Sequence, residues 1–205
     1  MTTVIAFVSQ KGGSGKTTLA VAVAVAAARA EDQVEVIDLD PQGSALTWGR
    51  CRGDEAPEVA ARHPPRLRQG IESARAAGAD VVVIDTGPRE GGGAAEAARL
   101  ADLVLIPCRP AAVDLAAVPA TLATVAGSEA VVVLNGCPPR GQWTPQATEA
   151  LRSIGAKVCP VTLGYRVAHA RSFMAGRTAQ ELEGRSVAAA EVTALHEWIR
   201  REGGA

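Results

Sequence analysis

The chain has 205 residues, of which 47% are hydrophobic but only 3% aromatic, and its formal net charge is −1. This length fits one domain with a sizeable core of aliphatic side chains. The near-zero charge excludes a global attraction to nucleic acid or anionic lipid, so such binding would need a local patch. The N-terminus has no basic region and no apolar run reaches the ~18 residues of a membrane span, so we expect neither a secretion signal nor membrane binding.

The apolar runs predict an alternation of strands and helices. A β-branched run predicts a strand at 3–9 that stops at a glycine-rich turn, and a helix is expected over 16–30, where Gly and Pro are absent. Further runs predict strands at 34–38, 80–85, 102–107, 130–135 and 156–161. Because nearly all these runs are continuous rather than alternating, they favour an α/β fold with a mostly parallel sheet flanked by helices on both faces.

The rest of the chain gives no sign of a second domain. Residues 51–65 are polar and contain three prolines, which indicates a surface excursion rather than a linker. We therefore expect one domain over 1–205. The four cysteines are widely separated and lack nearby histidines, which predicts reduced thiols in a cytoplasmic protein.

The sequence GGSGKTT at 12–18 follows a predicted strand and opens a predicted helix, which is the context of a phosphate-binding loop. Small residues let successive N–H groups turn toward one anion, and the helix N-terminus adds partial positive charge. Lys16 is expected to reach the β- and γ-phosphates, and the Thr17 hydroxyl to ligate Mg²⁺. The predicted nucleotide contacts are Gly12, Gly13, Ser14, Gly15, Lys16, Thr17 and Thr18.

Lysine is rare in this chain, since 18 of the 21 basic residues are arginine, yet Lys11 and Lys16 lie five positions apart. The stretch KGGSGKTT resembles the deviant Walker A box of the ParA/MinD group of P-loop ATPases. The resemblance implies an ATP- and Mg²⁺-dependent homodimer in which Lys11 acts on the partner's nucleotide and Lys16 on its own. A slim ammonium suits both tasks better than a planar guanidinium.

Acidic residues end two further predicted strands. Asp38 and Asp40 lie in VIDLDPQGS, which is similar to the family's DxDPQ box, and the resemblance implies that Asp40 positions the attacking water. Asp38 either assists the metal or accepts hydrogen bonds from its loop. Asp85 ends VVVID in the pattern of a Walker B acid that supports Mg²⁺ together with Thr17. Asn135 resembles the family's adenine-reading residue, although a turn-forming Asn before Gly is equally natural.

The resemblance covers about residues 3–200. The short chain, without an N-terminal helix-turn-helix domain, is closest to small plasmid-type, ParF-like ParA proteins. This implies a slow ATPase whose dimer binds non-specific DNA on the nucleoid and is released by a ParB-like or ParG-like adaptor, thereby segregating DNA. Arg166, Arg171 and Arg177 are the candidate DNA contacts, although a solvated helix face explains them equally well.

Other readings stay open. Similar ATPases position a protein cargo, such as a chemoreceptor array or a microcompartment. A MinD-like membrane cycler would need a terminal amphipathic helix, whereas we expect Trp198 and Ile199 to dock on the body of the domain. An iron–sulfur ATPase fits poorly because the cysteine spacing is wrong, and an amidotransferase because there is little room for its substrate domain.

Overall fold

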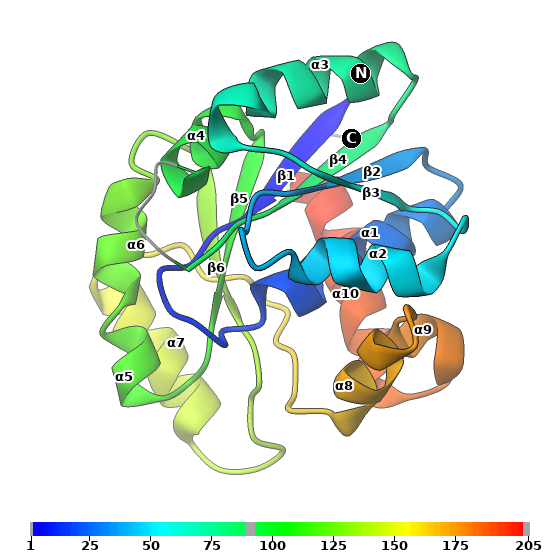
Figure 1. Cartoon of the computed structure of the whole chain (residues 1–205). Coiled ribbons are helices and arrows are strands. Elements are labelled where there is room, and N and C mark those ends of the chain that lie inside the picture. The colour runs from blue at the N-terminus through cyan, green and yellow to red at the C-terminus, as the bar shows by residue number, and fades with distance from the viewer. Residues whose placement is uncertain (1, 89–92, 203–205) are drawn as a thin grey trace.

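The computed structural model describes residues 2–88 and 93–202. This part of the chain contains one six-stranded parallel sheet with the strand order β3-β2-β4-β1-β5-β6 (Figure 1). The strands are β1 (Thr3–Phe7), β2 (Val34–Asp38), β3 (Glu58–Ala61), β4 (Val81–Asp85), β5 (Leu103–Cys108) and β6 (Ala130–Leu134). The predicted fold class, a parallel sheet between helical layers, is confirmed.

Helices cover both faces of the sheet (Figure 1). One face packs against α1 (Lys16–Arg29), α2 (Ser44–Arg52) and α10 (Val187–Glu202), and α8 (Val167–Met174) and α9 (Ala179–Leu182) lie beside them. The other face packs against α3 (Leu67–Ala76), α4 (Gly93–Leu100), α6 (Val118–Thr124) and α7 (Trp143–Ser153). A 3₁₀ turn at Pro64–Arg66 precedes α3, and the short α5 (Ala112–Leu115) follows β5.

The two helical layers explain why the strands read as continuous apolar runs. Along β1, Ile5 and Phe7 point into the core beneath α1 and α10, whereas Val4 and Ala6 point into the opposite core. Successive side chains of a strand alternate between faces, so a sheet covered on both sides needs apolar residues at every position. The small side chains of α1 are buried from Leu19 to Val25, which lets this helix lie close between the sheet and α10.

Two expectations about the sheet were wrong. Residues 156–161 form no strand but an isolated parallel bridge between Val158 and Val132, because the ladder is interrupted after Cys159: the next N–H group that donates to β6 is that of Leu163, which bonds the Leu134 carbonyl oxygen. The polar excursion at 51–65 instead contributes β3, which pairs with β2 from Glu58 to Ala61. Four residues on a sheet edge are too few to show a periodic pattern in the sequence.

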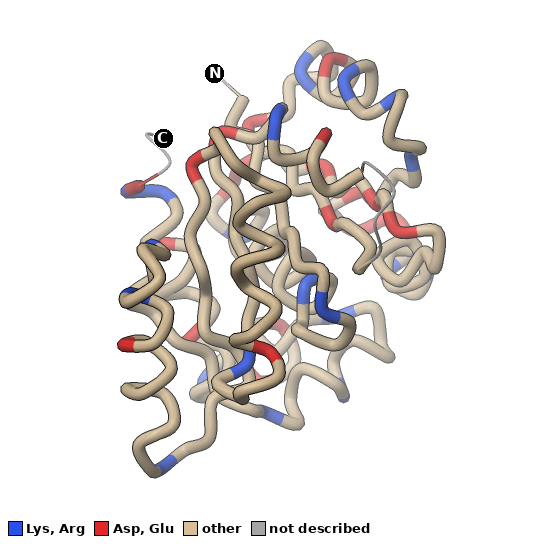
Figure 2. Tube along the Cα trace, turned by 90° about the vertical axis from the view of Figure 1, so that its left-hand side faces the viewer, with Lys and Arg blue, Asp and Glu red and all other residues tan. Residues whose placement is uncertain are grey.

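The C-terminal helix docks on the body of the domain, as expected. Trp198 and Ile199 are 8% and 2% exposed and pack in the core beside α1. None of the described helices is long and apolar enough to cross a membrane. Acidic and basic positions are interspersed along the trace (Figure 2), which agrees with the absence of a strong global charge.

A nearly buried ion pair attaches the α8–α9 segment to α2. The Arg52 guanidinium donates to both carboxylate oxygens of Glu181, at 2.8 and 3.1 Å, and also to the carbonyl oxygens of Ala56 and Gly176. Glu181 in turn accepts from the backbone N–H of Thr178 and caps α9. Every charged atom of the pair therefore has a partner, which a buried ion pair requires.

We predict that Glu181→Ala lowers the free energy of unfolding by about 3 kcal/mol, because it leaves the Arg52 guanidinium buried without its counter-ion. Chemical denaturation followed by circular dichroism measures this change. Glu55→Ala is the control, since Glu55 pairs with Arg177 on the exposed surface and should have a much smaller effect. Equal losses in the two variants would contradict the role assigned to the buried pair.

Candidate functional site

The carboxyl ends of β1, β2, β4, β5 and β6 meet at one edge of the parallel sheet, where the loop at 9–15 leads from β1 into α1. The N-cap residue of α1 is Gly15, where a φ of 97° and the nearby Asn135 side chain leave no room for a Cβ. A Cβ there would lie 2.1 Å from the Asn135 side-chain nitrogen. A loop of this shape directs its N–H groups and the helix N-terminus toward one anion.

Asn135 supports this loop from the end of β6. Its Nδ2 donates to the carbonyl oxygen of Ser14 at 2.8 Å, and its backbone N–H donates to the carbonyl oxygen of Cys108 at 2.8 Å. The side chain thus fixes the phosphate loop to the neighbouring strands. Its expected contact with adenine stays a prediction, because the structure contains no nucleotide.

Lys16 is 7% exposed, and its Nζ donates to the Lys11 carbonyl oxygen at 3.4 Å, so the ammonium lies inside the loop. Burial lowers the pKa of Lys16, and the negative charges of Asp85 and Asp40 oppose that shift. Lys11 itself is half-buried and lines a very small cavity with Cys108 and Asp114. The structure therefore places the Lys16 ammonium inside the loop, whereas the expected action of Lys11 on the partner's nucleotide stays a prediction.

The three predicted carboxylates have different surroundings. Both oxygens of Asp38 accept backbone N–H groups, from Asp40 at 2.9 Å and from Leu46 at 2.9 Å, so this residue organises the turn into α2. The structure shows the hydrogen bonds expected of Asp38, and its alternative role at the metal stays a prediction. Asp40 lies opposite Gly87, where a Cβ would come within 3.1 Å of its Oδ1, and it accepts the N–H of Gln42 at 3.0 Å.

Asp85 is fully buried, and neither of its carboxylate oxygens accepts a hydrogen bond from the described residues. Burial raises the pKa of Asp85 to about 7. The nearby Thr17 hydroxyl and the Lys16 ammonium act against this shift, whereas the negative charge of Asp38 adds to it. A buried carboxyl group without hydrogen-bond partners is typical of a residue that contacts a ligand or a metal. Thr17 and Asp85 lie where Mg²⁺ would be held beside the phosphate loop.

Within residues 2–88 and 93–202, no three His, Cys, Asp or Glu side chains form a cluster able to hold a metal alone. Mg²⁺ commonly binds through one or two protein oxygens together with substrate phosphates and water. The orphaned carboxylate of Asp85 fits that mode of binding. Mg²⁺ bound there would neutralise phosphate charge.

The three arginines predicted to contact DNA each lie beside an acid, away from the loop. Arg166 donates to Glu191 at 2.6 Å, Arg177 pairs with Glu55 and Glu181, and Arg171 lies 3.8 Å from Glu183. Their expected DNA contacts stay predictions. Since Arg171 has a 74% exposed side chain and the longest pair distance, it is the most available of the three.

Comparison with known proteins decides the family. The model of the CobQ/CobB/MinD/ParA nucleotide-binding domain matches residues 5–184. The chain belongs to this family. It is 34% identical over 198 residues to the maintenance of carboxysome distribution protein A of Gloeobacter kilaueensis, covering 92% of this chain and 88% of that protein.

Solved structures show the same fold of this MinD/ParA family. McdA of Cyanothece without nucleotide has a TM-score of 0.80 at 15% identity, covering 97% of this chain and 100% of the other. MinD of Pyrococcus horikoshii complexed with Mg-ADP has a TM-score of 0.75 at 19% identity, covering 100% and 98%. The relatives support the ParA/MinD assignment, whereas the plasmid-type ParF-like subgroup expected from the sequence gains no support.

One residue at the site escaped the sequence reasoning. Arg109 follows β5, and its guanidinium nitrogen would lie 3.3 Å from a Cβ on Gly13. The segment 106–118 resembled the family, but nothing in it distinguished this arginine from 17 others in the chain. Only the pairing of β5 with β1 and β6 brings it to the loop.

We predict that the nucleotide-free protein loses stability as pH rises from about 4 to about 7. The folded state keeps the Asp85 proton in this window because its pKa is raised from 3.8 to about 7, whereas the unfolded state loses it. Asp85→Asn should remove this dependence and be more stable than wild type at pH 8, by at most about 4 kcal/mol. Urea unfolding at pH 5 and pH 8 measures both proteins. Parallel pH profiles for the two would show that Asp85 is not protonated in the fold.

Proposed function

We propose that this protein is an ATP-dependent positioning ATPase whose cargo is a protein microcompartment. The observation that carries the proposal is the 34% identity, over nearly the whole of both chains, to a protein named for carboxysome distribution. The buried Lys16 and the unpartnered Asp85 carboxylate beside the phosphate loop support an ATP-dependent switch. Plasmid or chromosome segregation, the first reading of the sequence, has weaker support, because the similar putative plasmid partition protein of Borrelia burgdorferi is only 14% identical to this chain.

Each residue at the sheet edge has a role in hydrolysing ATP. The backbone N–H groups of the loop and the Lys16 ammonium bind the phosphates and neutralise charge that develops on them. Thr17 and Asp85 would hold Mg²⁺, which would neutralise further phosphate charge. Asp40, opposite Gly87, orients the attacking water toward the terminal phosphate.

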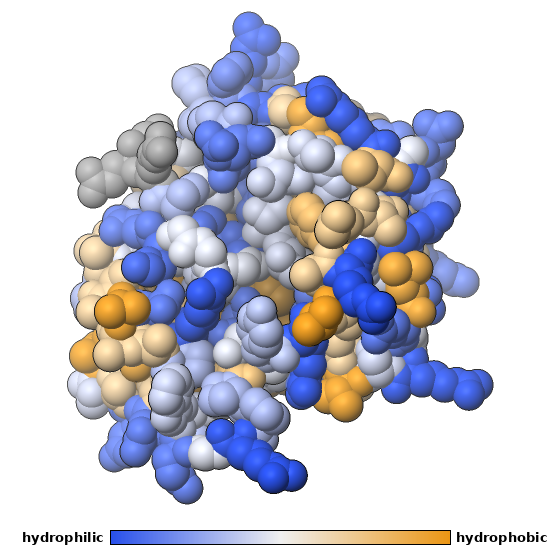
Figure 3. Space-filling model, turned by 60° about the horizontal axis from the view of Figure 1, so that its bottom comes forward, coloured by the Kyte–Doolittle hydropathy of each residue, from blue (hydrophilic) through white to orange (hydrophobic). Residues whose placement is uncertain are grey.

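The ATP-bound state is proposed to be a homodimer that closes over this edge. Seen from below, the face bearing the carboxyl ends of the strands shows apolar groups on two sides of a more hydrophilic middle (Figure 3). Val113, Val167, Met174 and Leu182 are exposed by 53–84%, and such surface commonly marks a protein interface. Lys11 would have to leave its half-buried place beside Asp114 to reach the partner's nucleotide.

Dimerisation is proposed to switch on non-specific DNA binding, which retains the protein on the nucleoid until an adaptor on the cargo stimulates hydrolysis. Contacts to DNA phosphates need Lys or Arg side chains that are not paired with acids. The affinity for DNA should fall steeply as the salt concentration rises. Because Arg166 and Arg177 are held by acids in the monomer, Arg171 is the best available contact. The dimer would add contacts by bringing two such surfaces together.

The cargo is tested in the source organism by deleting the gene and imaging a fluorescently tagged shell protein of its microcompartments. The proposal predicts that the compartments lose their even spacing and cluster, while resident plasmids are inherited normally. Evenly spaced compartments together with plasmid loss would overturn it in favour of DNA segregation. Restoring the gene with Asp40→Ala, which blocks hydrolysis, should fail to restore spacing.

The trans role of Lys11 makes a separate prediction. In an Asp40→Ala background, Lys11→Ala should stay monomeric with Mg-ATP although its affinity for ATP falls by less than about threefold, because its ammonium serves the other subunit. Light scattering coupled to size exclusion measures the mass. Lys157→Ala is the matched control, since this third lysine pairs with Glu129 at the exposed surface. Dimers of wild-type stability in Lys11→Ala would remove the trans role.

A further inference from the structure

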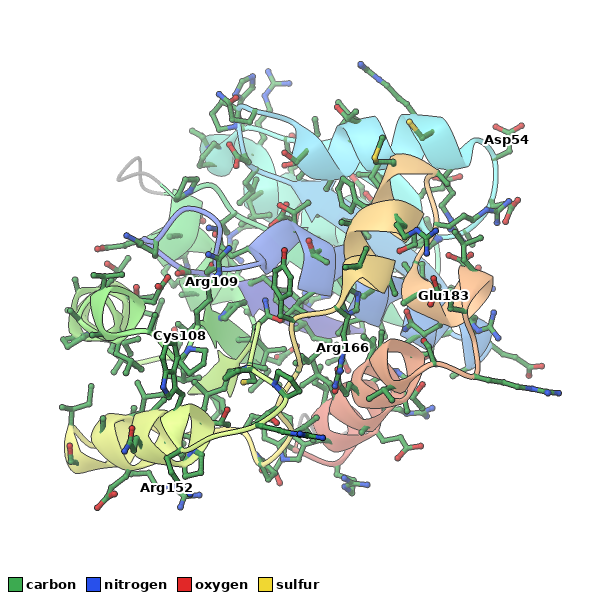
Figure 4. All side chains as sticks on the ribbon, turned by 90° about the horizontal axis from the view of Figure 1, so that it is seen from below. Asp54, Cys108, Arg109, Arg152, Arg166 and Glu183 are labelled. Atoms are coloured by element: carbon green, nitrogen blue, oxygen red, sulfur yellow. The ribbon has the colours of Figure 1, made fainter. Side chains whose placement is uncertain are left out.

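The β5–α5 connection places a third cation at the phosphate loop. Arg109 comes directly after β5, whose partners are β1, which leads into the loop, and β6, which leads into Asn135. Its Cγ would lie 3.7 Å from a Cβ on Gly136, and its Nη2 3.3 Å from a Cβ on Gly13. The stem therefore passes over the turn after β6, and the guanidinium ends at the phosphate loop. Figure 4 shows this side chain beside the loop and the end of β5.

The glycines make this approach possible. Gly13 has a φ of +72° and no side chain, so the planar guanidinium reaches the backbone at a distance that leaves little room for a Cβ. At Gly136, whose φ is +67°, a Cβ would only make ordinary van der Waals contact with the Arg109 stem. The close approach is therefore at Gly13, where an added Cβ would require the guanidinium to shift.

The charge at this point has no counter-ion on the described part of the chain. The Arg109 guanidinium makes no hydrogen bond or ion pair with residues 2–88 or 93–202, in contrast to Arg52, Arg166 and Arg177. Lys16 has Asp85 and Asp40 nearby to balance it. The exposed guanidinium lies beside the loop at Gly13, two residues before the N-cap of α1, where a bound anion would balance its charge.

We propose that Arg109 binds the phosphates of the nucleotide held in its own loop. The inference rests on the proposed nucleotide site and adds a residue to it. A guanidinium offers two parallel N–H donors that match two phosphate oxygens, a geometry that the ammonium of Lys16 cannot supply. Lys16 approaches the phosphates from inside the loop, and Arg109 closes the opposite side from β5.

The position of Arg109 favours its own subunit's nucleotide over the partner's. Its guanidinium already lies at the loop in a single chain, whereas Lys11 is half-buried and must move. The contact therefore needs no dimer and should act on ADP as well as ATP. This separates Arg109 from the role proposed for Lys11.

The test is calorimetric titration of Mg-ADP into wild type, Arg109→Ala, Arg109→Lys and Arg152→Ala. Arg152 is the matched control because it lies exposed on α7, away from the loop in Figure 4. We expect Arg109→Ala to weaken ADP binding about 10- to 100-fold, the usual effect of losing charged hydrogen bonds. Arg109→Lys should restore part of the affinity, and Arg152→Ala should stay within about twofold of wild type.

Two results would overturn the inference. One is an ADP affinity of Arg109→Ala within about twofold of wild type. The other is an equal loss in Arg109→Ala and Arg109→Lys together with a lowered melting temperature of both nucleotide-free variants, which would make the side chain a structural support of the loop. If wild type itself binds neither ADP nor ATP, the proposed nucleotide function fails instead, and the two failures are thereby distinguished.

Discussion

The structure depends on two ionisable groups, an amine and a carboxyl, that are buried at one edge of a parallel sheet. The Lys16 ammonium lies inside the phosphate loop and the Asp85 carboxylate at the end of β4, and the carboxylate has no hydrogen-bond partner among the described residues. Burial disfavours the charged form of both groups, which is why it lowers the pKa of Lys16 and raises that of Asp85. Such a site lowers the stability of the protein while it is empty. Binding of a metal-bound polyphosphate between the two groups would offset this loss.

The rest of the fold holds these groups in place. Parallel strands bring every carboxyl end to the same edge, so the loop after β1, the turn after β2 and the ends of β4, β5 and β6 meet there. The bond from Asn135 to Ser14 fixes the loop, and the bonds to Asp38 fix the turn that carries Asp40. Rigid support of this kind holds the side chains at this edge in a fixed arrangement.

The sequence predicted the scaffold well because its signals are local. The loop at 12–18, five of the strands and the acids at their ends follow from continuous apolar runs and from motif spacing. What it could not predict depends on tertiary contacts. The four-residue β3 is too short to show a periodic pattern, and the pairing of residues 156–161 with β6 is interrupted after one bridge. Arg109 reaches the loop only through the order of strands in the sheet. The pairing of Arg166 with Glu191 likewise joins residues 25 positions apart.

The central claim is that the buried pair of charges exists to receive Mg-ATP. Calorimetric titration of Mg-ATP into the nucleotide-free protein tests it most directly, with ATP in the presence of excess chelator as the comparison. The account predicts saturable binding of one nucleotide per chain that weakens without Mg²⁺ and falls about 100-fold in Lys16→Ala. Absence of binding to wild type, or equal affinities of wild type and Lys16→Ala, would contradict it.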